Sequence, residues 1–168
     1  NTSNELLIVG YKNANIDLLS GNSVFNLGDI KRANGYTGLK YINHIITEGD
    51  FAWVATGFGI VKIDVKKRIV IATYIIGENG TNLEVNKLAI EKNTQRMYAA
   101  TPNGLYSANM NDPLIFYQFW SKDTTLSQGN LSQLAVLNGA VLVNKVTQGS
   151  VEDSVFYNNG RNNREFQL

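Results

Sequence analysis

Few side chains in this sequence have the chemistry of a catalytic or zinc site. His44 is the single histidine of the 168 residues, and there is no cysteine. A Ser-His-Asp site needs its one histidine in reach of a nucleophile, and a zinc site needs several nitrogen or sulfur ligands. His44 lies between apolar residues in the string INHI. We expect it to line a central channel or to turn toward a neighbouring strand, with ligand binding as the alternative.

The carboxylates form no recognisable acid–base pair in the sequence. Glu48 and Asp50 flank an expected turn, and Asp64 ends an expected strand. A glycosidase needs two carboxyl groups about 5 to 10 Å apart across a cleft. The oxygen-rich segments 109–112 and 77–80 lack the alternating carboxylates of an EF-hand, and turns explain their asparagines. We therefore predict no catalytic residue, no metal ligand and no cofactor.

Glycine-rich and basic segments have structural explanations too. The string TGFG, Thr56 to Gly59, is not followed by the Lys-Ser/Thr pair of a phosphate loop, so we expect a hairpin turn. Residues 66–68, Lys-Lys-Arg, are expected at a solvated hairpin tip. Residues 29–32, Asp-Ile-Lys-Arg, lie in an expected crossing between repeats, a region that often reaches the ligand-binding face of a repeat protein. Arg161 and Arg164 add late basic character, but 15 Lys+Arg against 14 Asp+Glu predicts no nucleic-acid partner.

The elements that must position these residues repeat along the chain. FAWVATGFGIVKID (51–64) and RMYAATPNGLYSAN (96–109) share an apolar run ending in Ala-Thr, a glycine and a second apolar run. Gly59 and Gly104 are 45 positions apart. LLIVGYKNANIDLL (6–19) is an earlier copy, and a degenerate later copy begins at 140. Each copy is expected to be a β-hairpin, because its two runs of β-branched and aromatic residues are separated by turn residues.

A second element recurs between these hairpins. INHI, VNKL and LSQL begin at Ile42, Val85 and Leu131, at spacings of 43 and 46 positions. A period of about 40 to 50 residues built from strands is typical of propeller blades. We therefore predict an all-β fold, a partial β-propeller of about three and a half to four blades of four antiparallel strands. The outer strands are expected to resemble IFYQFWSK, residues 115–122.

One propeller piece, 1–168, accounts for the whole sequence, and its 43% apolar content is ordinary for a globular domain. Blade-like units are expected at 5–32, where the innermost strand is missing, and at 42–76, 85–122 and 131–168. Propellers close with about four to eight blades. The end blades are therefore expected to self-associate or to be covered by the rest of a larger ring. The start at Asn1 without Met suggests a processed or excised protein, and no run of about 18 apolar residues predicts a membrane span.

Particular strings carry a family resemblance beyond the general pattern. They are LLIVGYKNANIDLL, GDIKRAN, YINHI, ATGFGIVKIDVKK, TYIIGENGTNLEVNKL, YAATPNGLYSANMNDPLIFYQFWSK and GNLSQLAVLNG. Together they resemble the first propeller of PorZ-like proteins, the surface-exposed two-propeller components of the type IX secretion system of Bacteroidetes. The resemblance covers most of residues 6–144 and fades over 145–168. It implies an exported protein with further blades and a second propeller, working with a sortase-like attachment complex and binding anionic lipopolysaccharide.

The resemblance implies no catalytic residue, so the expected function is a non-enzymatic binding or assembly module. Its expected partners are a glycan or lipopolysaccharide and the proteins of the secretion complex, at the cell surface or in the periplasm of a Gram-negative bacterium. Tyr36, Tyr41 and His44 are candidate contributors by fold position alone. One alternative is the periplasmic sensor propeller of a hybrid two-component regulator, whose usual Leu-Trp-Ile/Val-Gly-Thr string is AWVAT or MYAAT here. A propeller-fold polysaccharide-degrading enzyme is another.

Overall fold

Runs of β-branched and aromatic residues, interrupted by Gly, Asn and Asp, form antiparallel sheets through the described part of the chain. The computed structural model describes residues 6–36, 39–126, 129–147, 149, 153–159 and 163–167, the last of these by backbone only. The first two sheets are β1 (Leu6–Gly10), β2 (Ile16–Ser20) and β3 (Ser23–Leu27), then β4 (Ile42–Glu48), β5 (Phe51–Thr56), β6 (Gly59–Asp64) and β7 (Ile69–Tyr74). The next two are β8 (Lys87–Glu91), β9 (Arg96–Thr101), β10 (Gly104–Asn109) and β11 (Ser121–Lys122), then β12 (Leu131–Leu137), β13 (Ala140–Lys145), β14 (Ser154–Asn158) and β15 (Asn163–Gln167).

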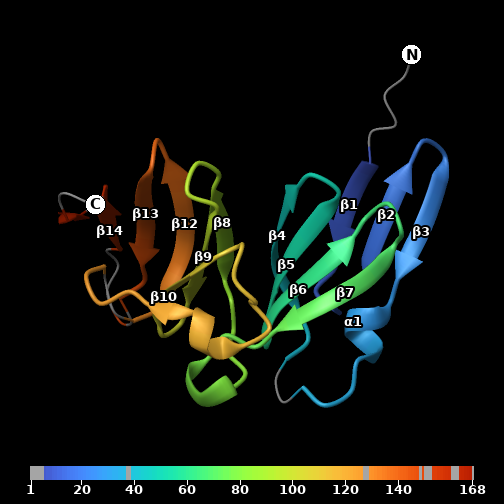
Figure 1. The fold of residues 1–168 in the computed structure, drawn as a ribbon, viewed down its shortest axis with the longest axis horizontal. Helices are drawn as coiled ribbons and strands as arrows, with labels where there is room; N and C mark the ends of the chain where they lie inside the picture. Colours follow the sequence, from blue (N-terminus) through green and yellow to red (C-terminus); the bar gives the residue numbers. More distant parts are fainter. Residues whose placement is uncertain are drawn as a thin grey trace.

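The sheets stand in a row with their strands ordered as in the sequence, so each is a propeller blade (Figure 1). The inner strands β4, β8 and β12 contact one another in succession, and β1 contacts β4. The row is open, which confirms the predicted all-β partial propeller. The first sheet has three strands and the others have four. No helix of the described residues is both long and apolar enough to cross a bilayer.

Two turns on the crossing side of the blades are built alike. Thr56 Oγ1 donates to the Gly59 carbonyl at 2.8 Å, and Thr101 Oγ1 donates to the Gly104 carbonyl at 2.7 Å. Each threonine oxygen also accepts a backbone N–H from the turn. Gly59 and Gly104 have φ of 149° and 117°, which residues with a Cβ rarely adopt. The 45-residue repeat therefore reflects a repeated turn geometry.

The prediction of an outer strand over residues 115–122 is wrong for most of that segment. Only Ser121 and Lys122 pair with β10, and the 3-10 turn η2 (Tyr117–Phe119) precedes them. The turn carries Trp120 inward, where its Nε1 donates to the Leu114 carbonyl at 3.1 Å. Burying a tryptophan stabilises the fold by more free energy than the β propensities of a few residues supply. Packing therefore decides the conformation of this segment.

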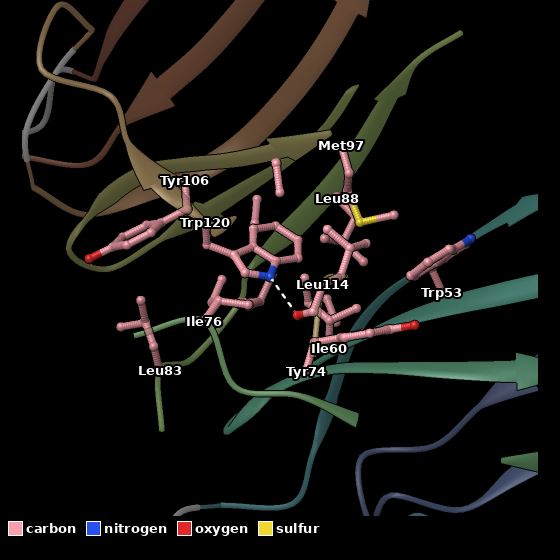
Figure 2. Packing of buried hydrophobic residues seen from close by; sticks show 14 residues of the cluster. Trp53, Ile60, Tyr74, Ile76, Leu83, Leu88, Met97, Tyr106, Leu114 and Trp120 are labelled. Atoms are coloured by element: carbon pink, nitrogen blue, oxygen red, sulfur yellow. Dashed lines mark hydrogen bonds between the residues drawn. The ribbon is translucent and has the colours of Figure 1, made fainter. Parts of the chain in front are cut away.

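Among the described residues, three apolar cores lie between successive blades rather than within one of them. The middle core joins the second and third blades, and Figure 2 shows side chains from both sides meeting there. Its largest members are Trp53, Ile60, Tyr74, Ile76, Leu83, Leu88, Met97, Tyr106, Leu114 and Trp120. Ile60, Leu88 and Met97 are at most 1% exposed. Each blade is therefore stabilised mainly by its neighbours, as in other repeat proteins.

Two short helical elements lie in the crossings between blades. Helix α1 (Asp29–Arg32) precedes the second blade, and the 3-10 turn η1 (Glu78–Gly80) precedes the third. Ile30 is the buried residue of α1. Turns η1 and η2 contact each other along the lower edge in Figure 1. The crossings before the second and third blades therefore lie along this edge.

Candidate functional site

The starts of two inner strands, β4 and β8, are each tied to the next blade by an asparagine. Asn43 Nδ2 donates to the Val85 carbonyl at 2.8 Å and to Glu84 Oε1 at 3.2 Å. Asn86, at the same place in the next repeat, donates to the Leu131 carbonyl at 2.8 Å. The side-chain amide supplies two donors, which suits this bridging position. These asparagines hold neighbouring blades in register.

His44 also makes a contact between blades. Its Nδ1 accepts the Leu88 N–H at 3.2 Å, so the imidazole is turned toward the neighbouring inner strand, one of the two expected arrangements. Burial lowers the pKa of His44 below its usual value, and the nearby Lys87 ammonium lowers it further. An accepting Nδ1 requires the neutral ring with its proton on Nε2. His44 therefore supports the packing of β4 against β8.

Acidification is expected to weaken this contact and to destabilise the protein. Because the folded state lowers the pKa of His44, the unfolded chain binds the proton more readily. The contribution is complete above the unfolded pKa of about 6.5 and is lost as the pH falls from there through the folded pKa. Urea unfolding at pH 7.5 and 5.5 should show a larger decrease in the midpoint for the unmodified chain than for His44→Gln. An equal decrease in both proteins would exclude His44 as the cause.

The two tyrosines proposed with His44 are each engaged by another protein group. Tyr36 stacks on the buried Phe58, with ring centroids 4.5 Å apart and planes at 17°. Burial raises the pKa of Tyr41, and a hydrogen bond with Glu84 raises it further. Glu84 also accepts from Asn43. Tyr36 packs the crossing and Tyr41 joins the contact between blades, so these candidates have structural partners.

The buried carboxylates cap turns. Asp64 accepts the Lys67 N–H at 2.8 Å, and this backbone bond is the main reason that the pKa of Asp64 is lowered. Glu91 accepts backbone N–H groups of the following turn, and its bonds to Thr94 lower the pKa of Glu91. Both carboxylates therefore stabilise the turns that follow them.

The other carboxylates discussed for catalysis or metal binding are at the surface. Glu48 pairs with Lys92 at 3.0 Å and Asp50 pairs with Lys66 at 2.9 Å. Residues 109–112 form a turn in which the Asn111 N–H bonds Asn109 Oδ1. Within the part of the chain that the structure describes, no three His, Asp or Glu side chains gather as a metal site would require.

The basic segments are exposed. Arg32 pairs with Asp29 at 3.7 Å on α1. Lys67 pairs with Asp64 at 3.3 Å, and Arg68 lies over the Phe25 ring at 5.1 Å. Arg161 lies outside the described residues, and only the backbone of Arg164 is described. Residues 66–68 occupy the turn between β6 and β7, the expected hairpin tip.

A cleft beside the crossing between the second and third blades was not identified from the sequence. We call it the crossing-loop cleft and define it by two adjoining hollows of about 430 and 290 Å³ that share Glu78, Tyr106 and Lys122. Asn82 and Asn103 line the larger hollow, and the smaller is lined by Tyr117, Gln118 and Trp120, among others. The loop at 77–84 and the Asn-Gly turn at 103–104 were visible as turns. Their meeting depends on packing between blades.

The crossing-loop cleft has a rigid floor and mixed polarity. Gly80 N–H bonds the Gly77 carbonyl at 3.0 Å, and Thr81 Oγ1 donates to the Glu78 carbonyl at 2.8 Å. A Cβ at Gly77 would lie 2.3 Å from the Thr81 carbonyl oxygen, so the loop requires glycine there. Burial raises the pKa of Tyr106, and the Glu78 carboxylate raises it further. Tyr106 therefore stays a neutral hydroxyl, able to donate and to accept.

The two charged side chains of the cleft do not pair with each other. Glu78 and Lys122 line both hollows, yet they form no ion pair within 4 Å among the described residues. With the amides of Asn103 and Gln118 and the ring of Tyr117, they offer donors, acceptors and an aromatic face to a polar ligand. This set suits hydroxyl-rich molecules better than apolar ones.

Solved structures share this fold over nearly all of the chain. PorZ, a surface component of the type IX secretion system of Porphyromonas gingivalis, aligns with a TM-score of 0.76 and 21% identity over 95% of this chain and 20% of its own. The extracellular domain of a putative one-component system from B. thetaiotaomicron aligns with a TM-score of 0.56 and 15% identity, over 95% of this chain and 21% of its own. Kuenenia stuttgartiensis hydrazine synthase aligns with a TM-score of 0.61 and 13% identity, over 95% and 48%.

The sequence itself identifies the family. No curated protein matches the chain. The profile of the N-terminal β-propeller domain of PorZ, of the type IX secretion system, matches residues 1–121. This is well over half of the sequence. It covers the first three blades except Lys122, and the lining of the crossing-loop cleft except Lys122 and Gly129. The chain spans about a fifth of the PorZ structure that it resembles. It belongs to the family of PorZ N-terminal β-propeller domains.

Proposed function

We propose that this propeller is a binding module of an exported secretion-system component, and that the crossing-loop cleft recognises a glycan, such as the polysaccharide of an anionic lipopolysaccharide. The observation that carries the proposal is the cleft itself. Glu78, Tyr106 and Lys122 line both of its hollows, and Glu78 and Lys122 form no ion pair with each other. The family supports the setting, since the similar PorZ is described as a surface component of its secretion system.

The chemistry of the cleft fits a sugar chain better than a flat apolar ligand. Sugars present hydroxyl groups that both donate and accept, and Asn103, Gln118 and the Tyr106 hydroxyl do the same. The Tyr117 ring offers an apolar face for the C–H side of a sugar ring. Lys122 supplies a positive charge for a carboxylate or phosphate on the chain.

We also propose that the module has no catalytic activity. Asp64 and Glu91 are held by turn amides with lowered pKa, so they are unsuited to act as general acids near neutral pH. Glu48 and Asp50 are paired with lysines at the surface. His44 uses Nδ1 to accept a backbone N–H. The cleft contains a single carboxylate, Glu78, among its described lining residues.

Protein contacts are the second part of the proposal. The outward face of the first sheet exposes Leu7 (60%) and Val24 (63%). Both are cross-strand neighbours of Leu19 on the middle strand β2, so the three side chains lie in one row. An apolar sheet face of this kind is where a propeller blade normally packs on its neighbour. We propose that another blade, from the same ring or from a second copy, covers it.

Binding of lipopolysaccharide-derived polysaccharide should depend on the crossing-loop cleft. The intact protein is titrated calorimetrically with polysaccharide released by mild acid from the lipopolysaccharide of the bacterium that encodes it. Lys122→Ala is expected to weaken binding about tenfold, because it removes a charge-assisted hydrogen bond worth about 1.5 kcal/mol. Tyr117→Ala is expected to have a similar effect, because it removes the aromatic face on which a sugar ring packs.

Lys92→Ala is the matched control, since Lys92 lies in the turn between β8 and β9, away from the cleft lining. It should bind like the unmodified protein. Unchanged binding by both cleft variants would place the site elsewhere. Absence of any binding by the unmodified protein would refute glycan recognition.

A further inference from the structure

A second groove lies on the outer flank of the second and third blades and shares no lining residue with the crossing-loop cleft among the residues described. It encloses about 460 Å³ and is lined by Trp53, Lys62, Ile71, Ala72, Tyr74, Met110, Asp112, Pro113, Leu114 and Ile115. We call it the Lys62 groove. Most of its walls are apolar side chains, and Lys62 is the single cation of this described lining.

Lys62 is held in an unusual environment. Its Nζ lies 4.1 Å from the centroid of the Phe51 ring and 4.5 Å from the centroid of the Trp53 ring. No carboxylate of the described residues lies within 4 Å of this ammonium, although the exposed Asp112 lines the same groove. Burial lowers the pKa of Lys62. Two aromatic faces therefore orient a partly desolvated cation that has no anionic partner in the described part of the chain.

The next blade shows that the fold does not require this lysine. The position equivalent to Lys62, 45 residues later, is Ser107. Ser107 Oγ accepts from Arg96 Nε at 3.1 Å and from Nη2 at 3.0 Å, so the cation of that blade has a partner within its own sheet. The second blade has Phe51 in place of Arg96 and leaves its cation available. The difference indicates a specific role for the second blade.

A β-bulge shapes one wall of the groove. The pairing of β6 with β7 shifts between Lys62 and Ile63, so Ile71 is the extra residue of β7. Neighbouring residues of a regular strand point to opposite faces, yet Ile71 and Ala72 both line the Lys62 groove. Bulges re-aim side chains in this way. Ile71 on one side and Ile115 on the other remain 43% and 56% exposed.

Trp53 adds an unmet donor at the same place. Its side chain is 2% exposed, and Nε1 has no hydrogen-bond partner among the described residues. Figure 2 shows Nε1 on the edge of the ring turned away from Leu88. A buried polar atom without a partner costs about 1 to 3 kcal/mol, so such atoms in natural proteins call for an explanation.

We propose that the Lys62 groove binds an extended peptide segment of a partner protein, with an acidic side chain of that segment on the Lys62 ammonium and aliphatic side chains on Ile71 and Ile115. The charge complementarity selects a carboxylate, and the exposed isoleucines select aliphatic neighbours for it. Strand β7 is the outer edge of its sheet, so an extended segment beside it gains main-chain hydrogen bonds. An anionic lipid surface fits less well, because one recessed cation attracts it weakly.

The test uses the intact protein and two blocked peptides, acetyl-Val-Ile-Glu-Ile-Val-amide and the same peptide with Gln for Glu. The two indole N–H signals of Trp53 and Trp120, the only tryptophans, are followed by NMR during each titration. The Glu peptide should shift the Trp53 signal and bind about tenfold more tightly than the Gln peptide, as expected for one charge-assisted hydrogen bond.

Lys62→Met, which keeps an aliphatic stem between the two rings, should abolish the difference between the peptides, and Lys66→Met should preserve it. If Lys62→Met does not fold, the comparison of the two peptides on the unmodified protein decides alone. Equal binding of both peptides, or no shift of the Trp53 signal at millimolar concentrations, overturns the proposal. So does Lys62-dependent binding to phosphatidylglycerol vesicles without peptide discrimination, which would assign the groove to lipid.

Discussion

Replacing Trp120 by alanine is expected to lower the free energy of unfolding by about 3 to 5 kcal/mol, the usual cost of removing a buried tryptophan. Trp120 is 6% exposed and packs in the core between the second and third blades. Its indole N–H also bonds the Leu114 carbonyl, which holds the loop that replaces the outer strand. The substitution therefore leaves a cavity and releases a loop, so both blades lose support. Urea unfolding followed by circular dichroism measures the effect.

Phe119→Ala is the matched control for this prediction. Phe119 precedes Trp120 directly, is also aromatic, and is 40% exposed. We expect its substitution to change the unfolding free energy by less than about 1 kcal/mol, as for most surface positions. Similar losses for both variants would mean that burial between the blades does not explain the stability of this region.

Gly59→Ala is expected to destabilise the chain by about 3 kcal/mol, because backbone strain of about 1 to 3 kcal/mol adds to a steric clash. Gly59 has φ of 149°, and a Cβ there would lie 2.3 Å from the Tyr74 carbonyl oxygen. Gly59 and Tyr74 lie in the paired strands β6 and β7, so the new Cβ and the Tyr74 carbonyl cannot separate without disrupting that pairing. The loss is measured as the change in the urea midpoint at constant slope.

Gly21→Ala separates the two causes. Gly21 also has a positive φ of 55°, but a Cβ at this position would meet no described atom within 4 Å. It should therefore cost only the left-handed backbone term of about 1 kcal/mol. If Gly59→Ala costs no more than Gly21→Ala, the close approach of Tyr74 does not constrain the turn.

The repeat pattern predicts the fold well because its signals are local. Gly59 and Gly104 mark the same turn, and the threonines three residues before them make the same hydrogen bonds. Turn chemistry and strand alternation depend on neighbours a few residues away, so a single sequence shows them. The segment 115–122 is the instructive failure, because Trp120 is drawn into a core contributed largely by residues 53–108.

The candidate functional surfaces were harder to predict, because their residues come from distant parts of the sequence. His44 contacts Leu88, which is 44 positions away, and Lys122 lines the same hollows as Glu78, which is also 44 positions away. The character of each residue was visible in the sequence, but its neighbours were not. Tyr36, Tyr41 and His44 were selected by fold position, and each proved to have a structural partner. The crossing-loop cleft was overlooked because its residues come from loops with no distinctive motif.

Composition, turn glycines and a period near 45 residues were enough to establish blades, and several strings were enough to suggest the family. Which polar groups stay available for a ligand depended on contacts between blades. Lys62 looks like an ordinary strand lysine until the bulge at Ile71 and the facing loop at Ile115 enclose it. Strand formation depends on local backbone preferences, whereas a groove is formed by surfaces that meet only after the blades have packed.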